Sequence, residues 1–463
     1  MKDRRIDEAV TRLRDRLRPD QISVRLAERL AYSYDATWVE GLPDIVVHAE
    51  STADVAWVLR IADEMEIPVT PRGGGTGLAG GAVPTTGGIC LNLARMNRIL
   101  EINPIDGIAI AQPGVTTYSL QKAAESYGLF YPPDPASLYM CTIGGNVATN
   151  AGGPCCLKYG VTRDYVLGLE IVIPGGKILR WGGRVMKDVS SYDLKQLFIG
   201  SEGTLGVITE ITVRLLPKPP SIGGIAVAFE KIESACEAVT SILSNGILPL
   251  MAELMDQKTM QAVEAFHPYG LPIEAEALLL LATDGKEEAV QTDLARMIRV
   301  IDAFGGQVIR VAEDTESANQ LWEPRRQVSP AIARLAPHKL SEDITVPRSQ
   351  IPRMIQHIQR ISRESNIPIV IYGHIGDGNL HPTLLFNRQN SEEMRRVAKA
   401  ALQILQAALD LGGTLSGEHG IGILKLDLLP AAFSPAAIEK LWAIKLIFDP
   451  KNIMNPGKKL PIL

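Results

Sequence analysis

Two histidines on either side of a tight turn are the residues of this chain best placed to do chemistry. His374 and His381 flank a Gly-Asp-Gly-Asn segment, a sequence that readily folds a chain back on itself. Such a turn directs both imidazoles at one place. Because imidazole is the commonest side-chain ligand of metal ions and also a general base near neutral pH, the pair indicates a metal site or a proton-transfer site.

A second cluster, Ser416-Gly417-Glu418-His419-Gly420, adds a carboxylate and a third imidazole. Two histidines and a glutamate suit a divalent metal with one open position, and the remaining histidine can then act as a base beside it. The ordinary alternative is a set of hydrogen-bonded turn histidines and an exposed Glu-His pair. The presence of both clusters in a chain of only seven histidines favours the metal site.

Composition describes a globular protein and excludes several partner classes. The chain has 463 residues, 46% of them hydrophobic and 21% charged, which predicts two or three domains. Its net charge of −5 gives no electrostatic basis for binding nucleic acid or an anionic membrane. The charged start Met1-Lys2-Asp3-Arg4-Arg5 lacks the apolar stretch of a signal peptide, and no apolar run is long enough to span a bilayer.

Cysteine usage points to a reducing compartment. The five cysteines form no pair of CxxC motifs, so structural disulfides, a cysteine-ligated zinc and an iron–sulfur cluster are not expected. We therefore expect a cytoplasmic protein, or one held at a membrane surface only through a partner.

Alternating strand and helix patterns indicate the elements that hold these residues. Pro174-Gly175-Gly176 predicts a hairpin between strands at residues 167–173 and 177–181. Pro217-Lys218-Pro219-Pro220 is the best linker candidate. Beyond it, two β-α-β units in series predict a split β-α-β sheet of ferredoxin-like layout. The expected strands are residues 224–229, 248–255, 277–283 and 307–312, and the expected helices are residues 232–243 and 287–304. Residues 367–374 and 380–386 should pair around the histidine turn, while helices are expected at residues 322–335, 353–364 and 392–411.

Two glycine-rich loops precede the linker. The first, residues 72–81, contains six glycines, whose backbone N–H groups can line a concave anion site. It is neither a GxGxxG nor a GxxxxGK[ST] motif, which disfavours a nicotinamide Rossmann site and a P-loop NTPase. The second, residues 142–153, adds asparagine and threonine side chains. Two such loops together indicate a large cofactor with a diphosphate, such as FAD.

These motifs resemble a known family. The first loop, the run from Gly144 to Gly153 and the segment from Tyr192 to Gly206 resemble the FAD domain of the vanillyl-alcohol oxidase/PCMH superfamily. The histidine clusters and the Asn455-Pro456-Gly457-Lys458 tail resemble its D-2-hydroxyacid dehydrogenase branch. That branch includes the glycolate oxidase D subunit, D-lactate dehydrogenase and D-2-hydroxyglutarate dehydrogenase. The resemblance covers about residues 40–460.

The resemblance implies an α+β fold in four parts. An N-terminal helical segment at 1–38 precedes a two-subdomain PCMH-type FAD-binding domain at 39–218. A ferredoxin-like cap at 219–425 carries the substrate and metal residues, and a C-terminal helical segment at 426–463 returns to the FAD domain. Some members attach FAD to a histidine in the first loop; Thr76 stands at that position here, so noncovalent FAD is expected.

Carried over residue by residue, the resemblance assigns His374, His381 and Glu418 as ligands of a divalent metal, zinc or manganese. His419 corresponds to the general base, and Arg325, Lys339 and Asn379 to substrate-binding residues. The expected FAD contacts are Pro71, Arg72, Gly73, Gly74, Gly75, Thr76, Gly77, Leu78, Asp134, Cys141, Thr142, Gly144, Gly145, Asn146, Ala148, Asn150, Gly152, Glu202, Gly203, Gly206, Ile208 and Asn455.

The implied activity is FAD-dependent oxidation of a D-2-hydroxy acid, of glycolate or D-lactate type, to the 2-oxo acid. Electrons would pass to a non-NAD acceptor, and the resemblance implies an iron–sulfur subunit or an electron-transfer flavoprotein as the partner. D-2-hydroxyglutarate stays open as the substrate. Two readings from other classes also stay open: a metal-dependent hydrolase of a nucleotide-like substrate, and a non-catalytic electron-transfer or assembly subunit.

Overall fold

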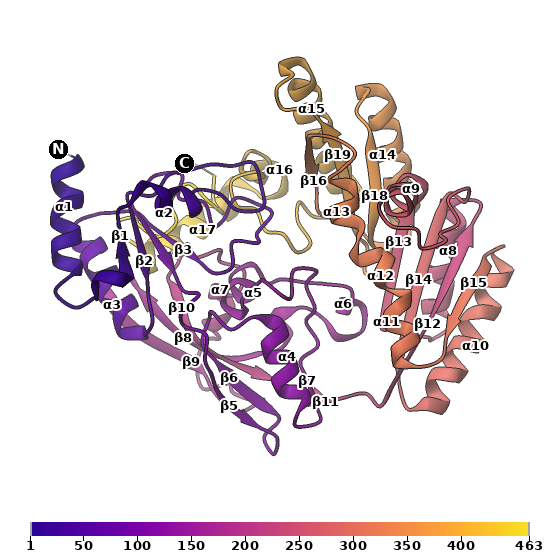
Figure 1. The fold of residues 1–463 in the computed structure, drawn as a ribbon, viewed down its shortest axis with the longest axis horizontal. Coiled ribbons are helices and arrows are strands. Elements are labelled where there is room, and N and C mark those ends of the chain that lie inside the picture. The colour runs from indigo at the N-terminus through magenta and orange to yellow at the C-terminus, as the bar shows by residue number, and fades with distance from the viewer. Residues whose placement is uncertain (1, 462–463) are drawn as a thin grey trace. The chain divides into compact units, whose positions relative to one another are not determined.

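The structure, a computed structural model, describes residues 2–461. The chain divides into two compact units, each built from discontinuous segments (Figure 1). The first unit comprises Met1–Gly152, Val161–Lys218 and Glu418–Leu463. The second comprises Gly153–Gly160 and Pro219–Gly417.

A small sheet organises the N-terminal part of the first unit. Its strand order is β1-β2-β4-β3, with β2, β4 and β3 parallel. Helix α3 (Thr52–Glu64) begins at Ser51, whose hydroxyl accepts a hydrogen bond from the Asp54 N–H, and it buries an apolar face against this sheet. The elements are α1 (Lys2–Leu13), β1 (Ile22–Ser23), α2 (Leu26–Ala31), β2 (Ile45–His48), β3 (Val69–Arg72) and β4 (Ile89–Asn92).

A five-stranded antiparallel sheet, in the order β5-β6-β10-β8-β9, forms the rest of the first unit's scaffold. The hairpin expected around Pro174-Gly175-Gly176 is confirmed as the β8–β9 pair. The elements are β5 (Ile99–Asn103), β6 (Ile108–Ala111), α4 (Thr117–Glu125), β7 (Leu129–Phe130), α5 (Ile143–Thr149), β8 (Val166–Ile173), β9 (Lys177–Gly182), α7 (Lys195–Phe198), β10 (Val207–Arg214), β11 (Leu216–Pro217), α16 (Leu429–Ala432) and α17 (Pro435–Phe448).

The C-terminal tail completes the first sheet. The Val69 N–H donates to the Ile453 carbonyl at 2.8 Å, and the Asn455 N–H donates to the Val69 carbonyl at 2.8 Å. The tail therefore satisfies backbone groups at the edge of β3. Just before it, the buried Lys445 ammonium is paired with Asp449 and also donates to the Thr204 carbonyl at 2.7 Å.

One large sheet organises the second unit, in the order β15-β12-β14-β13-β18-β19-β16, with β17 pairing to β19. Its first four strands have the order expected of a split β-α-β sheet, and three more strands and the short β17 extend it. The strands are β12 (Ser221–Phe229), β13 (Met251–Asp256), β14 (Ala277–Gly285), β15 (Gln307–Ala312), β16 (His338–Ser341), β17 (Ile344–Thr345), β18 (Ile369–His374) and β19 (Asn379–Phe386).

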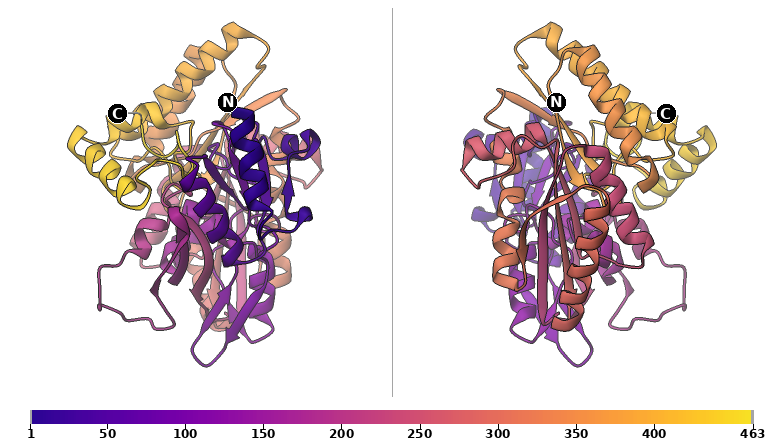
Figure 2. Two further views of the ribbon diagram at one scale, coloured as in Figure 1. Left: turned by 90° about the vertical axis from the view of Figure 1, so that its left-hand side faces the viewer. Right: turned by 90° about the vertical axis from the view of Figure 1, so that its right-hand side faces the viewer.

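Helices pack on this sheet, and α14 and α15 lie side by side (Figures 1 and 2). The helix expected at residues 322–335 is instead two short helices, because Pro330 lacks the N–H that would bond to the Arg326 carbonyl in a continuous helix. The helices are α6 (Cys156–Tyr159), α8 (Ile232–Ser244), α9 (Gln257–Phe266), α10 (Glu287–Ala303), α11 (Thr315–Leu321), α12 (Glu323–Arg326), α13 (Val328–Ile332), α14 (Ile351–Ser365) and α15 (Ser391–Asp410).

The unit boundaries differ from the expected ones in two places. Residues 153–160 group with the second unit, where the Lys158 ammonium pairs with Asp284 at the end of β14. Residues 418–425, expected in the cap, group with the first unit. There the N–H groups of Ile421 and Gly422 donate to the buried Glu202 carboxylate at 2.9 and 2.7 Å.

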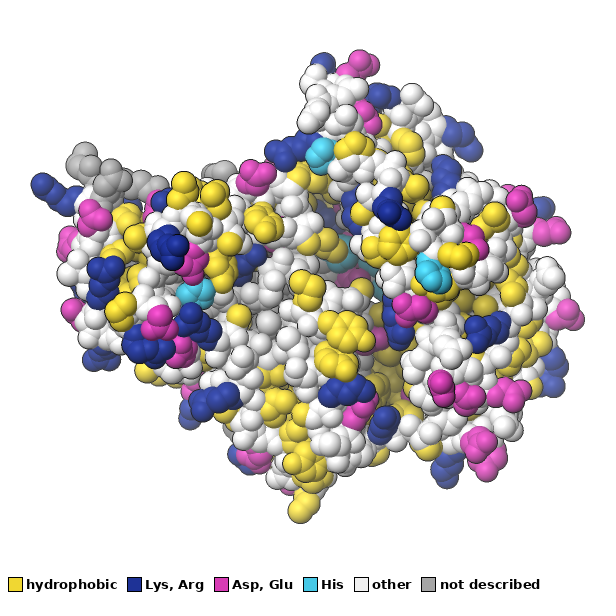
Figure 3. All heavy atoms as spheres, viewed as in Figure 1, with side chains coloured by type: hydrophobic (Ala, Val, Ile, Leu, Met, Phe, Trp, Pro, Cys, Tyr) yellow, Lys and Arg dark blue, Asp and Glu magenta, His cyan; other side chains and the backbone are white. Residues whose placement is uncertain are grey.

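Surface charge is mixed. On the face drawn in Figure 3, lysine and arginine side chains are interspersed with aspartate and glutamate rather than gathered in one field. Within residues 2–461, every helix is too short or too polar to cross a membrane.

Candidate active site

The β18–β19 hairpin brings the two turn histidines together. Tyr372 pairs with His381 across the strands, and His374 pairs with Asn379. Since alternate strand residues share a face, the two histidines are diagonal neighbours on one face of the sheet. Their ring centroids lie 5.1 Å apart, nearly perpendicular, and both side chains are buried. The predicted convergence of the two imidazoles is therefore present in the second unit.

The turn between the histidines depends on a glycine. Gly378 has a φ of +90°, and a Cβ built there would lie 2.1 Å from the Val346 carbonyl oxygen. Only glycine accepts both the left-handed backbone and this close approach. The Asn379 N–H then donates to the Asp377 carboxylate at 3.2 Å, which helps to close the turn.

A buried carboxylate that the sequence analysis did not single out holds one imidazole. Glu253 lies opposite His374 in the β13–β18 register, and its Oε1 is 2.5 Å from His374 Nδ1. The Glu253 side chain is fully buried. With Nδ1 facing a carboxylate, His374 would bind a metal ion through Nε2, the arrangement that commonly orients metal-binding histidines.

Arg325, on α12, meets the same carboxylate. Its Nε donates to Glu253 Oε2 at 2.8 Å, and its guanidinium carbon lies 5.0 Å from the centre of the Tyr372 ring. The side chain is largely buried. This contact engages Nε. A substrate carboxylate would therefore contact the two terminal nitrogens. The expected substrate role of Arg325 stays a prediction.

The other two expected substrate residues have partners in the second unit. The Lys339 ammonium donates to the Ser329 carbonyl and hydroxyl at 3.0 and 2.8 Å, and burial lowers the pKa of Lys339. The Asn379 amide donates to Asp343 Oδ1 at 2.7 Å and to the Ile344 carbonyl at 2.9 Å. Asn379 thus positions the β17 segment, and for both residues a substrate contact stays a prediction.

Glu418 and His419 follow directly after Gly417, the last residue of the second unit. Gly417 packs so closely that a Cβ there would lie 2.4 Å from Asn379 Nδ2. Glu418 and His419 are one and two residues after Gly417, so the chain itself keeps them near the histidine hairpin. The His419 Nε2 lies 3.7 Å from Glu418 Oε1, so the neighbouring side chains stay close to each other.

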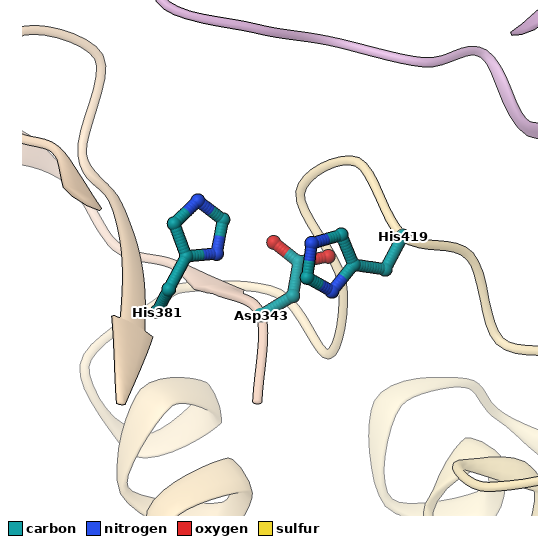
Figure 4. A group of neighbouring side chains, drawn as sticks. All are labelled: Asp343, His381 and His419. Carbon is teal, nitrogen blue, oxygen red and sulfur yellow. The ribbon is translucent and has the colours of Figure 1, made fainter. Parts of the chain in front are cut away.

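Two overlapping sets of side chains have the donor chemistry and spacing for a metal ion. Potential ligand atoms of His374, His381 and Glu418 all lie within 4.8 Å of one another, and so do those of Asp343, His381 and His419 (Figure 4). The first is the predicted set. The second adds Asp343, a buried aspartate that the sequence analysis did not assign and that accepts a hydrogen bond from the Ser416 hydroxyl at 2.6 Å. Nitrogen and carboxylate donors of this kind fit zinc or manganese.

In the first unit, the two predicted glycine loops lie against each other. A Cβ at Gly74 would lie 2.3 Å from the Met140 carbonyl oxygen, and one at Gly73 would lie 2.4 Å from Thr142 Oγ1. Side chains at these positions would force the loops apart. The loops thus form a surface of exposed backbone, which fits the close approach of a diphosphate-containing cofactor.

Several expected FAD contacts have protein partners for their polar side chains. Asn146 Nδ2 donates to Thr117 Oγ1 at 2.6 Å, and Asn150 Oδ1 accepts from the Arg163 N–H at 2.9 Å. Asn455 Nδ2 donates to the Glu202 carbonyl at 2.7 Å, while the Glu202 carboxylate holds residues 421–422. These hydrogen bonds hold the loops in their conformations. Their contact with FAD stays a prediction, as it does for the other loop residues.

Arg72, also expected to contact FAD, crosses the first loop. Its Nη1 donates to the Tyr34 carbonyl at 2.7 Å and to the Ala82 carbonyl at 3.3 Å. The largely buried guanidinium therefore connects both ends of the loop.

Thr117, which was not predicted as a site residue, is fully buried behind the second loop. It is hydrogen-bonded to Asn146 and, at 3.3 Å, to the Cys141 sulfur.

Comparisons with known proteins agree on the class. Residues 43–182 match the FAD binding domain family, and residues 218–459 match the FAD linked oxidases, C-terminal domain. The chain is 44% identical to the glycolate oxidase subunit GlcD of Bacillus subtilis, over 95% of this chain and 94% of that protein. It is 36% identical to a D-lactate dehydrogenase of Anaerostipes hadrus, over 91% and 90% of the two chains.

Solved structures share the fold at lower identity. Substrate-bound p-cresol methylhydroxylase superposes with a TM-score of 0.82 at 20% identity, covering 99% of this chain and 97% of that one. The 4-ethylphenol oxidase of Gulosibacter chungangensis superposes with a TM-score of 0.80 at 20% identity, covering 99% and 98%. The expected PCMH-type α+β fold is confirmed. By its matched domains and relatives, the chain belongs to the family of FAD-linked oxidases and is an FAD-dependent oxidoreductase.

Proposed function

We propose that this enzyme oxidises a small 2-hydroxy acid, of glycolate or D-lactate type, to the 2-oxo acid. The observation that carries the proposal is the contact of His374 and Arg325 with the two oxygens of one carboxylate, Glu253. A candidate metal ligand and a candidate carboxylate-binding guanidinium are thereby held side by side. A 2-hydroxy acid presents its hydroxyl and its carboxylate on adjacent carbons. Relatives named glycolate oxidase subunit and D-lactate dehydrogenase support the substrate class.

His374, His381 and Glu418 would hold a divalent metal, which supplies Lewis-acid stabilisation of a hydroxyl oxygen as it loses its proton. Bound FAD supplies the acceptor for the hydride that leaves C2. The protein's own side chains then have two tasks, which are to orient the substrate and to remove the hydroxyl proton.

Arg325 would perform the first task. A guanidinium can hold a carboxylate through two parallel N–H donors, which fixes the plane of the substrate and hence the direction of its C2 hydrogen. His419 would perform the second task by accepting the hydroxyl proton at a ring nitrogen. Asp343 offers an oxygen close to the same histidine and would help to hold its ring.

Turnover would then require a further acceptor for the two electrons that bound FAD takes up. One relative is named as a subunit of glycolate oxidase, which supports a partner protein that receives them. We propose an iron–sulfur subunit or an electron-transfer flavoprotein as that partner. Binding to this partner would also hold the enzyme at a membrane surface.

Anaerobic mixing of the purified yellow protein with candidate substrates tests the proposal. Glycolate or D-lactate should bleach the visible flavin absorbance within a single turnover, and L-lactate should do so more slowly. If only D-2-hydroxyglutarate reduced the flavin, this larger 2-hydroxy acid would be the substrate instead. Failure of every 2-hydroxy acid to reduce the flavin, in protein that dithionite still reduces, would contradict the proposal.

Acid precipitation of the same protein tests how FAD is held. Because Thr76 replaces the histidine of covalent members, the flavin should appear in the supernatant. Colour that stays with the pellet would show a covalent link.

A further inference from the structure

Glu253 is a fully buried carboxylate of the second unit, and both of its oxygens have partners. It lies on β13 between the apolar residues Ala252 and Leu254. A buried carboxylate is costly unless both oxygens are paired. Here one oxygen faces His374 Nδ1 at 2.5 Å and the other accepts from Arg325 Nε at 2.8 Å.

The two partners come from different parts of the unit. His374 ends strand β18, beside β13 in the sheet, whereas Arg325 lies on the short helix α12. The carboxylate is planar, so its rotation toward one partner moves the other oxygen away from the second. The Tyr372 ring lies 5.0 Å from the guanidinium carbon and 5.5 Å from the His381 ring centroid, which limits how far Arg325 can shift independently.

Building on the proposed function, we infer that Glu253 is the positioning residue on which both metal binding and carboxylate recognition depend. It orients His374 Nε2 toward the metal and sets the guanidinium of Arg325 for the substrate carboxylate. Loss of a carboxylate behind a metal-binding histidine lowers metal affinity by about 10–100-fold. Because the same group holds Arg325, substrate affinity must fall in the same variant.

The test uses Glu253→Gln in the full-length FAD-loaded protein. Glutamine keeps the size and has one carbonyl oxygen, so it can accept from only one of the two partners. Equilibrium dialysis with zinc should show affinity roughly 10–100-fold weaker than wild type. Anaerobic flavin reduction should show a raised dissociation constant for the substrate that the wild type uses. Glu253→Asp, which keeps the charge but is shorter by one methylene, should recover part of both losses.

Asp284→Asn is the matched control. Asp284 is also a buried carboxylate of this sheet with a cationic partner, Lys158, but it contacts none of the candidate metal ligands in the hydrogen bonds of the described residues. It should lose stability and keep zinc affinity near wild type. If it lost zinc affinity as much as Glu253→Gln does, the effect would be a general loss of packing and the inference would be overturned.

A double-mutant cycle tests the coupling itself. Arg325→Met should lower the affinity for the substrate while leaving zinc affinity within a few-fold of wild type. With zinc kept saturating, adding Glu253→Gln should then lower substrate affinity little further, since residues in one network are non-additive. Additive losses would overturn the coupling. Zinc bound equally by wild type and Glu253→Gln would overturn this inference alone, whereas a wild type that binds neither zinc nor manganese would overturn the proposed metal site together with it.

Discussion

The glycine loops of the first unit and the histidine hairpin of the second are built in opposite ways. At the loops, close backbone approach at Gly73 and Gly74 makes the surface, and nearby polar side chains such as Asn146 are bonded to the protein. At the hairpin, buried side chains meet one another, as Glu253 does with His374 and Arg325. Adding atoms should therefore damage the loops, whereas removing atoms should damage the cluster of buried side chains on the hairpin strands.

The largest effect is expected from His381→Ala. Losing an imidazole ligand should empty the metal site, and the Lewis-acid contribution of several kcal/mol corresponds to a fall in turnover on the order of 10³–10⁵-fold. FAD content should stay at the wild-type level because the loops lie in the other unit. Metal analysis and flavin absorbance of one sample check both statements. Full metal content in this variant would contradict the assignment of His381.

His419→Asn should have the next largest effect. A positioned base contributes about 10²–10⁴-fold, so single-turnover flavin reduction should slow by roughly that factor with FAD retained. Metal content distinguishes the two sets of candidate ligands. Retained metal supports His374, His381 and Glu418 as the ligands, whereas loss of metal favours the set with Asp343. Reduction at a rate near wild type would remove the base role.

Gly74→Ala tests the loops by addition of a single methyl group. Its Cβ would lie 2.3 Å from the Met140 carbonyl oxygen, and relief of such overpacking costs about 1–3 kcal/mol. Because relief of this overlap must displace one of the two loops that form the expected FAD site, FAD affinity should drop by roughly 5–150-fold while zinc affinity is unchanged. Gly183→Ala is the matched control, since no atom lies within 4 Å of the Cβ position there. Equal FAD affinity in both variants would show that the loops do not shape the cofactor site.

The smallest effect concerns pH and Lys458, whose burial lowers its pKa to about 7. The unfolded chain holds this proton up to about pH 10.5, so the folding free energy should become more favourable as pH rises above 7, and that stabilisation is absent below it. The slope contributed is at most about 1.4 kcal/mol per pH unit. Lys458→Met should flatten the rise between pH 7 and 9 in denaturant titrations. An unchanged slope would show that Lys458 stays charged in the fold.

What could be predicted from the sequence was local. The turn between His374 and His381 follows from glycine and asparagine within eight residues, and the β8–β9 hairpin from Pro174-Gly175-Gly176. The split β-α-β strand order followed from alternating periodicities. Each of these signals lies within a short stretch of chain, where backbone preferences act directly.

The contacts that were missed depend on distant pairing. Glu253 meets His374 only because β13 and β18 are neighbours in a particular register, and a shift of one residue would turn Glu253 to the other face. A glutamate within an apolar predicted strand was the available signal. The grouping of residues 418–425 with the first unit likewise depends on the Glu202 carboxylate, which accepts backbone N–H groups over 200 residues away in the chain.

The pairing of β3 with the C-terminal tail has a consequence for synthesis on the ribosome. Val69 emerges early, but its backbone partners Ile453 and Asn455 emerge more than 380 residues later. At about 5–20 residues per second, the edge of β3 waits on the order of tens of seconds while the whole second unit is made. The nascent chain thus carries an open sheet edge, which a chaperone must shield or a neighbouring chain can join.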